Sequence, residues 1–275
     1  MFRSMRIGKR DFWLDGRPYI MGILNVTPDS FSDGGNYADL DTALRHTEKM
    51  IASGADIIDV GGESTRPGHT PVTAGEEIAR TCFVIEAIKE RFEIPVSLDT
   101  SKSKVAEAGI LAGADLINDI WGLTQDDGMA EVIAKHKVAC CLMHNRSNTD
   151  YSNLIEDVKK DLLSSVAIAG AAGIPDEKIM IDPGIGFAKD TKQNLRVLAR
   201  LEEYTRLGYP LLLGISRKSV IGNTLSLPVD KREEATVALT VQGYLNGALF
   251  HRVHDVKKNR RALDMIYAVR REKED

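Results

Sequence analysis

Short apolar runs rich in Val, Ile and Leu recur every few tens of residues along the chain, separated by amphipathic, charged segments. Continuous runs, rather than alternating ones, indicate strands covered on both faces, as in a parallel sheet surrounded by helices. The runs are 19–24, 56–60, 94–98, 115–117, 138–143, 178–181, 211–215 and 248–253. Repeated strand–helix units of this number predict an α/β fold, a closed (β/α)8 TIM barrel, with a doubly wound open sheet as the alternative.

Glycine and proline mark the ends of several helices expected between these strands, as is typical of helix C-termini. The helix candidates with such ends are 40–53 before Gly54, 75–91 before Pro95 and 102–111 before Gly113. The resulting connections are short and regular, which supports the barrel prediction.

The segment that precedes the first unit, residues 2–17, carries a turn signal at Asp15-Gly16. We expect it to form a short N-terminal β-hairpin that closes the base of the barrel. Because no Ser- or Pro-rich linker interrupts the chain, we expect a single domain over residues 1–275 with its core at about 19–268.

The composition excludes several classes of protein. The 275 residues carry a formal charge of −4, so no general basic field favours nucleic acid, and an anion site must be built locally. No run reaches the roughly 18 apolar residues of a membrane span, and no apolar stretch follows the N-terminal charges. We therefore expect a cytoplasmic protein. Cys82 and the adjacent Cys140 and Cys141 favour buried free thiols, because neighbours on a strand point to opposite faces.

Nearly every apolar run ends in a polar group. The set comprises Asn25, Asp59 and Glu63, Asp99, Asn118, His144 and Asn145, Asp182, Ser216 to Lys218, Arg252 and His254. In a (β/α)8 barrel the C-terminal ends of all strands meet at one face, so these side chains would surround a single cavity. Capping of the next helix is the alternative for single members such as Asp99 or Asn118-Asp119, but the coincidence over eight strand ends favours an active site.

One part of this set suits a heterocycle. Asp182 directly follows an apolar strand, and Gly184 and Gly186 allow the backbone behind it to approach a ligand closely. Together with Asp99 and Asn118, it supplies acceptors and donors for a ring edge that carries adjacent N–H and NH₂ groups. A pterin or a purine is such a ligand.

Another part of the set is cationic. Ser216-Arg217-Lys218-Ser219 and Arg252-Val253-His254 follow the seventh and eighth strands, where barrels commonly bind phosphate. Alternation along an extended chain sends Arg252 and His254 to the same side, so both could bind one anion. We therefore predict a phosphorylated substrate.

Polar segments with Gly and Pro, 25–35 and 61–68, follow the first two strands, and we expect them to act as mobile lids. The remaining histidines are not paired with an arginine as His254 is with Arg252, and we expect them to be surface or structural residues. They are His46, His69, His136 and His251.

These residues resemble the motifs of the dihydropteroate synthase family from position 21 to position 255. The matching stretches are MGILNVTPDSFSDGG (21–35), DVGGESTRPG (59–68), SLDT (97–100), ND (118–119), MHN (143–145), DPGIGF (182–187), SRK (216–218) and RVHD (252–255). The resemblance implies a (β/α)8 barrel, usually a homodimer, of tetrahydrofolate biosynthesis. It would condense 6-hydroxymethyl-7,8-dihydropterin diphosphate with p-aminobenzoate to 7,8-dihydropteroate and diphosphate by a dissociative mechanism, and sulfonamides would inhibit it.

The resemblance also implies roles for particular residues. Those expected to bind the pterin are Asp99, Asn118, Asp182 and Lys218. Those expected at the diphosphate are Asn25, Arg66, Arg252 and His254, with Mg²⁺ bound through Asn25. The implied p-aminobenzoate site comprises Phe31, Thr65, Pro67, Phe187, Lys218 and Ser219. The implied catalytic residues are Asp99, Asp182, Lys218, Arg252 and His254.

Two other functions compete with this interpretation. A methyltransferase barrel of the methyltetrahydrofolate type would share the carboxylate and Asn positions but has no diphosphate to bind, so Arg66, Arg252 and His254 argue against it. A non-catalytic pterin-binding paralogue belongs to a different class, and the intact loop motifs count against it.

Overall fold

A computed structural model describes residues 3–26, 37–63 and 72–272 of the chain. Its strands are β1 (Ser4–Ile7), β2 (Arg10–Trp13), β3 (Tyr19–Asn25), β4 (Ile57–Gly61), β5 (Val96–Asp99), β6 (Leu116–Asp119), β7 (Ala139–Met143), β8 (Ile179–Asp182), β9 (Leu212–Leu213) and β10 (Phe250–Val253). Its α-helices are α1 (Tyr37–Ala52), α2 (Ala74–Arg91), α3 (Ser103–Leu111), α4 (Met129–His136), α5 (Leu154–Ala171), α6 (Thr191–Ala199), α7 (Glu202–Thr205), α8 (Ser219–Leu225), α9 (Glu233–Leu245) and α10 (Val256–Arg271), and short 3-10 turns are η2 (Asp176–Lys178) and η3 (Val229–Lys231).

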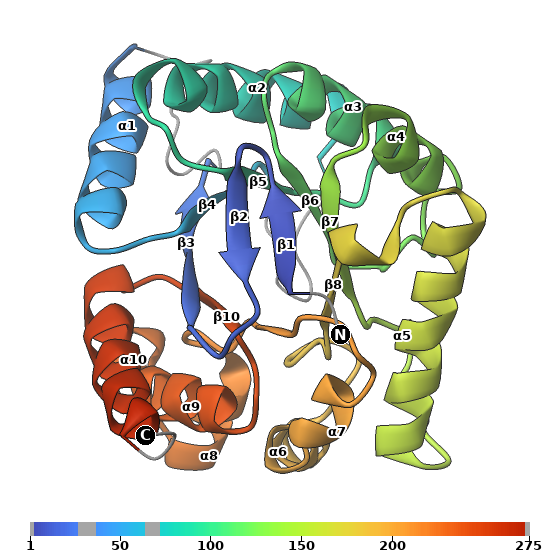
Figure 1. The fold of residues 1–275 in the computed structure, drawn as a ribbon, viewed down its shortest axis with the longest axis vertical. Coiled ribbons are helices and arrows are strands. Elements are labelled where there is room, and N and C mark those ends of the chain that lie inside the picture. Colours follow the sequence, from blue (N-terminus) through green and yellow to red (C-terminus); the bar gives the residue numbers. More distant parts are fainter. Residues whose placement is uncertain (1–2, 27–36, 64–71, 273–275) are drawn as a thin grey trace.

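Strands β3 to β10 form a parallel barrel with helices on its outside (Figure 1). The hydrogen-bonded order is β8-β7-β6-β5-β4-β3-β10-β9. The ring closes where Ile181 of β8 pairs with Leu211 and donates its N–H to the carbonyl of Pro210 at 3.0 Å. The barrel prediction is therefore confirmed, and the open, doubly wound alternative is wrong. Strand β9 is shorter than expected, because only Leu212–Leu213 of the apolar run 211–215 pairs with a neighbouring strand.

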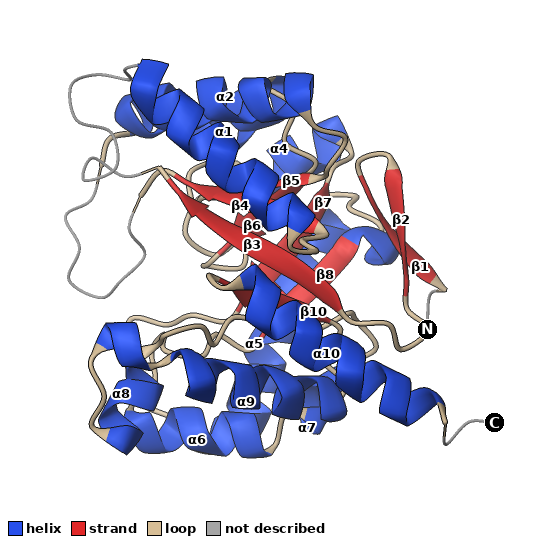
Figure 2. Cartoon of the chain, turned by 90° about the vertical axis from the view of Figure 1, so that its left-hand side faces the viewer, coloured by secondary structure: helices blue, strands red, loops and turns tan. Residues whose placement is uncertain are grey.

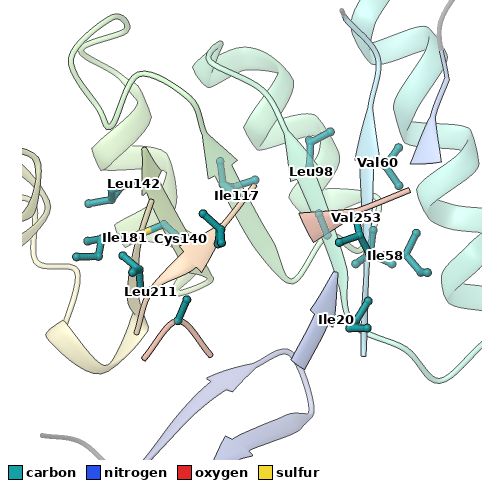
Figure 3. Packing of buried hydrophobic residues seen from close by; sticks show 14 of the residues in the cluster. Ile20, Ile58, Val60, Leu98, Ile117, Cys140, Leu142, Ile181, Leu211 and Val253 are labelled. Carbon is teal, nitrogen blue, oxygen red and sulfur yellow. The ribbon is translucent and has the colours of Figure 1, made fainter. Parts of the chain in front are cut away.

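The apolar runs are continuous because each strand is buried on both faces. Figure 3 shows one face, where side chains such as Ile58, Leu98 and Ile117 pack between the strands and the surrounding helices. The neighbouring thiols separate as predicted: Cys140 joins this outer layer and Cys141 joins the cluster inside the barrel. Both are fully buried and free, whereas the free thiol of Cys82 is only half-buried.

The N-terminal hairpin closes one end of the barrel, as expected (Figure 2). Met5, Ile7 and Phe12 of β1 and β2 are buried against the interior residues of the barrel strands. Its turn was predicted wrongly, however. Ile7 pairs with Arg10, so the chain reverses at Gly8-Lys9, and Asp15-Gly16 lies in the connection to β3. A Cβ at Gly8 would lie 2.3 Å from Asp115 Oδ1, so this close approach requires glycine.

The three helices predicted from their ends correspond to α1, α2 and α3. Helix α2 begins with a capping box, in which Thr73 accepts the N–H of Glu76 and Glu76 accepts the N–H of Thr73. Within the described ranges, no helix combines the length and the apolar character that a bilayer crossing requires.

Candidate active site at the carboxyl ends of the strands

The barrel mouth, the end of the barrel where the strands finish, gathers the polar side chains that the sequence singled out. Asp99, Asn118 and Asp182 are the final or penultimate residues of β5, β6 and β8, and each is at most 5% exposed. Asp99 and Asn118 are direct partners in the register of neighbouring strands. Convergence of parallel strands thus brings together the residues predicted to bind a heterocycle.

Arg252 enters the same space from β10 and joins two carboxylates. Its Nε donates to Asp59 Oδ2 at 2.6 Å, and its Nη2 donates to Asp99 Oδ2 at 2.7 Å. Asp59 is fully buried, and its second oxygen accepts the hydroxyl of Ser97 at 2.6 Å. The guanidinium is therefore held in the mouth by Asp59 and Asp99, while its other N–H groups are not used by these two bonds.

Asp99 keeps one oxygen without a partner. Its Oδ1 is buried and has no hydrogen-bond partner among the described residues. Burial raises the pKa of Asp99 to about 7, against the lowering effect of Arg252 and with a further raising effect of Asp59. Since an unpaired buried acceptor costs roughly 1–3 kcal/mol, this oxygen is suited to accept an N–H from a ligand.

Asp182 and Lys218 both lie close to the backbone of Gly214, which has no side chain. A Cβ added at Gly214 would lie 3.5 Å from Asp182 Oδ2 and 3.7 Å from Lys218 Nζ. Burial raises the pKa of Asp182, and Lys218 opposes that shift. Burial likewise lowers the pKa of Lys218 to about 8. The two groups therefore offer an acceptor and a donor in the same part of the mouth, where neither charge is well solvated.

Lys218 is also tied to the turn that follows β8. Its Nζ donates to the carbonyl of Ile185 and lies 4.8 Å from the centroid of the Phe187 ring. Phe187 and Lys218, predicted together at the p-aminobenzoate site, are thus neighbours. Ser219, the first residue of α8, is exposed beside them.

His254 is oriented by Ser216. The hydroxyl oxygen of Ser216 accepts the backbone N–H of His254 at 3.2 Å and lies 2.9 Å from the imidazole Nδ1. An oxygen that already accepts one N–H can direct its own proton to Nδ1, which leaves the proton of the neutral ring on Nε2. His254 then presents an N–H donor, as anion binding requires.

The helix-cap alternative fails at the ends of β5 and β6, because the next helices, α3 and α4, have no side-chain cap. Asp119 accepts the N–H groups of Trp121 at 2.9 Å and Leu123 at 2.7 Å, so it stabilises a turn. Asp99 has no such role, because α3 begins after Lys102 and has no side-chain cap. Asp99 therefore remains available to a ligand.

Four predicted site residues lie outside the described residues: Phe31, Thr65, Arg66 and Pro67. Most of the two expected lid segments, 25–35 and 61–68, lies there as well. At the described edge of the second segment, Lys102 joins Glu63 to Glu77. The roles assigned to all the site residues stay predictions.

Asn25 fits the proposed Mg²⁺ by its chemistry. Its amide oxygen is a hard ligand and lies 3.8 Å from the position that a Cβ at Gly61 would take. The nearby Asp99 Oδ2 already accepts Arg252 Nη2. Among the described residues, no group of three His, Cys, Asp or Glu side chains is arranged as a metal site. Mg²⁺ commonly takes one or two protein oxygens and completes its shell with phosphates and water, which this donor set allows.

Several residues that hold the site residues by hydrogen bonds could not be found from the sequence. These groups are Ser97, whose hydroxyl donates to Asp59, and a chain formed by the partly exposed Asp161 and the buried His144 and Lys189 next to the turn that follows β8. His144 was noted only as a strand-end residue, and no spacing marks Lys189. Their partners lie far away in sequence, so no local pattern reveals them.

Comparison with known proteins identifies the family. Residues 21–254 match the model of the pterin binding enzymes. The dihydropteroate synthase of Clostridium beijerinckii is 58% identical over 262 residues, covering 95% of this chain and 97% of that protein. A crystal structure of dihydropteroate synthase from Clostridium difficile in the presence of pteroic acid has a TM-score of 0.90 and 48% identity, and covers 98% of this chain and 99% of that chain.

A structure of Xanthomonas albilineans dihydropteroate synthase with 4-aminobenzoic acid has a TM-score of 0.92 and 39% identity, and covers 98% of this chain and 99% of that chain. The similarity thus extends over nearly the whole length of both the relatives and this chain. It includes every strand end of the barrel mouth. The chain therefore belongs to the pterin-binding enzymes and, among them, to the dihydropteroate synthase family of transferases in folate synthesis.

Proposed function

We propose that this enzyme condenses 6-hydroxymethyl-7,8-dihydropterin diphosphate with p-aminobenzoate, giving 7,8-dihydropteroate and diphosphate. The unpartnered, buried Oδ1 of Asp99 beside Asn118 carries the proposal, because a pterin edge supplies the N–H that this oxygen lacks. Pteroic acid and 4-aminobenzoic acid, named with the Clostridium difficile and Xanthomonas albilineans structures, correspond to the joined product and to the arylamine substrate.

The pterin binds through the carboxylates and Lys218. Asp99 and Asp182 accept its N–H and NH₂ groups, Asn118 supplies a further donor and acceptor, and Lys218 donates to a ring acceptor. These contacts are strong because the carboxylates are nearly inaccessible to water.

The reaction is dissociative. The bond between the exocyclic CH₂ and oxygen breaks, diphosphate leaves with the electron pair, and the positive charge spreads over the ring. Asp99 and Asp182 stabilise that charge by their fixed position, so no protein nucleophile is needed. The arylamine nitrogen then forms the new C–N bond and loses a proton to solvent.

The leaving group is held by cations. The guanidinium N–H groups of Arg252 that are not bonded to Asp59 and Asp99, together with the N–H of His254, can donate to diphosphate oxygens. Asn25 would hold Mg²⁺, which supplies charge neutralisation for the diphosphate when bound. Arg66 would add a further cation.

Incubation of the protein with both substrates and Mg²⁺ tests the proposal, with dihydropteroate and diphosphate as the expected products. Pterin binding without product would favour a non-catalytic pterin-binding protein. Methyl transfer from methyltetrahydrofolate would favour a methyltransferase. Omission of Mg²⁺ should lower the rate, and restoration of the rate by added Mg²⁺ is the control.

We further propose that the enzyme is a cytoplasmic homodimer and that sulfonamides inhibit it by occupying the p-aminobenzoate site. Light scattering in solution should report twice the mass of the 275-residue chain. Inhibition by a sulfonamide should be competitive with p-aminobenzoate and not with the pterin diphosphate.

A further inference from the structure

The turn that follows β8 has an unusual backbone. Gly184, Gly186 and Ala188 have φ of 69°, 85° and 45°, so left-handed and ordinary residues alternate. A Cβ at Gly184 would lie 2.0 Å from the carbonyl oxygen of His144, which makes glycine necessary there. Ala188 has a Cβ and adopts the left-handed region at a cost of roughly 1–2 kcal/mol. Such a conformation persists where surrounding contacts impose it.

Lys189 supplies those contacts from inside the turn. The residue is 8% exposed, and its Nζ donates to the carbonyls of Gly184 at 3.1 Å and Phe187 at 3.2 Å. A third contact, at 2.8 Å, reaches His144 Nδ1. These three partners match the three protons of an ammonium group, and none of them is a carboxylate.

Burial lowers the pKa of Lys189 to about 7, so the free energy of folding includes a cost for keeping this group charged. A methionine would fill a similar volume without that cost. A lysine at this place is therefore better explained by what its three donors hold than by its contribution to stability.

His144 is oriented to receive Lys189. Its Nε2 lies 3.1 Å from Asp161 Oδ2, which also accepts Arg146 Nε at 2.6 Å. Burial and the charge of Lys189 lower the pKa of His144 to about 3, so the ring is neutral at physiological pH. Its Nε2 proton donates to the Asp161 carboxylate, and Nδ1 is left as an acceptor for Lys189. Asp161, His144 and Lys189 thus form one directed chain behind the turn.

The same turn places groups of the barrel mouth. Ile185, one residue after Gly184, offers its carbonyl to Lys218, and Phe187 presents its ring to the same ammonium at 4.8 Å. Asp182 has no bond to Lys189: its carbonyl accepts the backbone N–H of His144 at 2.9 Å, and its Oδ1 accepts the N–H of Gly184 at 2.7 Å. Loss of the Lys189 contacts should therefore disturb Phe187, whose carbonyl Lys189 binds directly, more than Asp182 or the bond between Lys218 and Ile185.

We propose that Lys189, oriented by His144 and Asp161, is a positioning residue that sets the place of Phe187 and thereby the affinity for the arylamine substrate. The inference rests on the proposed function, since Phe187 is expected at the site of the p-aminobenzoate substrate. Lys189 itself contacts the turn and not the reacting atoms.

Steady-state kinetics of Lys189→Met test the positioning role. A change in the KM for one substrate only separates positioning from a general loss of structure. The KM for p-aminobenzoate should rise about tenfold, corresponding to about 1.4 kcal/mol, while the KM for the pterin diphosphate changes less than about threefold. Lys178→Met is the matched control: Lys178 also donates to a carbonyl, that of Lys137 at 2.6 Å, but it does so at the exposed surface. That variant should match the wild type in both constants.

Tyr151→Phe provides a second probe that leaves the buried lysine in place. The Tyr151 hydroxyl donates to the carbonyl of Ala188 at 2.8 Å, so its removal loosens the same turn from outside. We expect a rise of about two- to threefold in the KM for p-aminobenzoate, the value of a weak hydrogen bond. If Lys189→Met does not fold, this variant decides the question.

The outcomes separate the inference from the function on which it rests. A wild-type protein that makes no dihydropteroate would overturn the proposed function. An active wild type whose Lys189→Met and Tyr151→Phe variants keep a normal KM for p-aminobenzoate would overturn the positioning role alone. An equal rise of both KM values would also overturn it, because it would indicate a general loss of structure.

Discussion

The two ends of the barrel interior are built from the same strands and differ in almost every other respect. At the base, the ring of Phe12 in the hairpin packs edge-on against Tyr19, with 4.9 Å between the ring centroids. Tyr19 stacks on Phe250, with 5.1 Å between the centroids. At the mouth, Arg252 lies between Asp59 and Asp99, one of which keeps an unpartnered oxygen. The base gains stability from apolar burial, whereas the mouth keeps charged groups where ligands can use them.

Phe12→Ala should have the largest effect, on stability alone. The ring is fully buried at the base, so its removal should lower the free energy of unfolding by roughly 3–5 kcal/mol. Chemical denaturation measures this, and Trp13→Ala is the control, because Trp13 is 55% exposed and the next residue of the same strand. A folded Phe12→Ala protein with strongly altered substrate KM values would mean that the two ends are not separable.

Asp182→Asn, at the mouth, should lower activity without lowering stability. Pterin use should fall by the value of a charged hydrogen bond, roughly 1.5–3 kcal/mol, or about 10- to 150-fold in kcat/KM. Stability should not fall, because burial raises the pKa of Asp182 and its charge therefore disfavours folding. Turnover and thermal melting, compared with the exposed control Asp127→Asn, measure both quantities. Near-normal turnover would remove Asp182 from the site.

The pH dependence of pterin binding should sharpen the contrast further. Since burial raises the pKa of Asp99 to about 7, the carboxylate accepts a proton as the pH falls through that value. Pterin affinity should then fall by up to about tenfold per pH unit, because the acceptor is lost. Binding titrations from about pH 5 to about pH 8, a range that brackets this pKa, measure the effect. A pterin affinity that does not change with pH would exclude an ionised Asp99 as acceptor.

The same group has the opposite effect on stability. Between its ordinary value of 3.8 and the folded value of about 7, Asp99 binds a proton in the folded chain and not in the unfolded chain. Its contribution to the free energy of unfolding therefore falls as the pH rises through this window. Asp99→Asn should flatten that slope relative to the wild type, which denaturation at several pH values measures.

Ala188→Gly should give the smallest change. Its φ of 45° lies in the left-handed region, which glycine adopts without the steric cost, although glycine gains freedom in the unfolded chain. We expect a net gain of roughly 0.5 kcal/mol in the free energy of unfolding, with normal kinetics. A loss of stability would show that the turn at the mouth carries no strain at this residue.

The architecture, and the choice of residues that gather at the mouth, follow from the order of residues along the chain. Continuous apolar runs indicate strands buried on both faces, in a sheet covered by helices. In a parallel barrel the carboxyl ends of these strands meet at one face. Asp99, Asn118, Asp182, Lys218 and Arg252 could therefore be placed together without coordinates. The hairpin was also predictable, but its turn was not. Gly8 combines a left-handed φ of 58° with the close approach of Asp115, and that approach depends on the fold.

The pairing of those groups depends on the three-dimensional fold. Arg252 contacts Asp59 across 193 residues, and Lys189 contacts His144 across 45. No local pattern encodes such contacts, since they depend on which side chains the closed barrel turns toward one another. Burial then determines their charge, because removal of water raises the pKa of Asp99 and lowers that of Lys189. The residue types at the mouth are a property of the chain, but their protonation and orientation are properties of the fold.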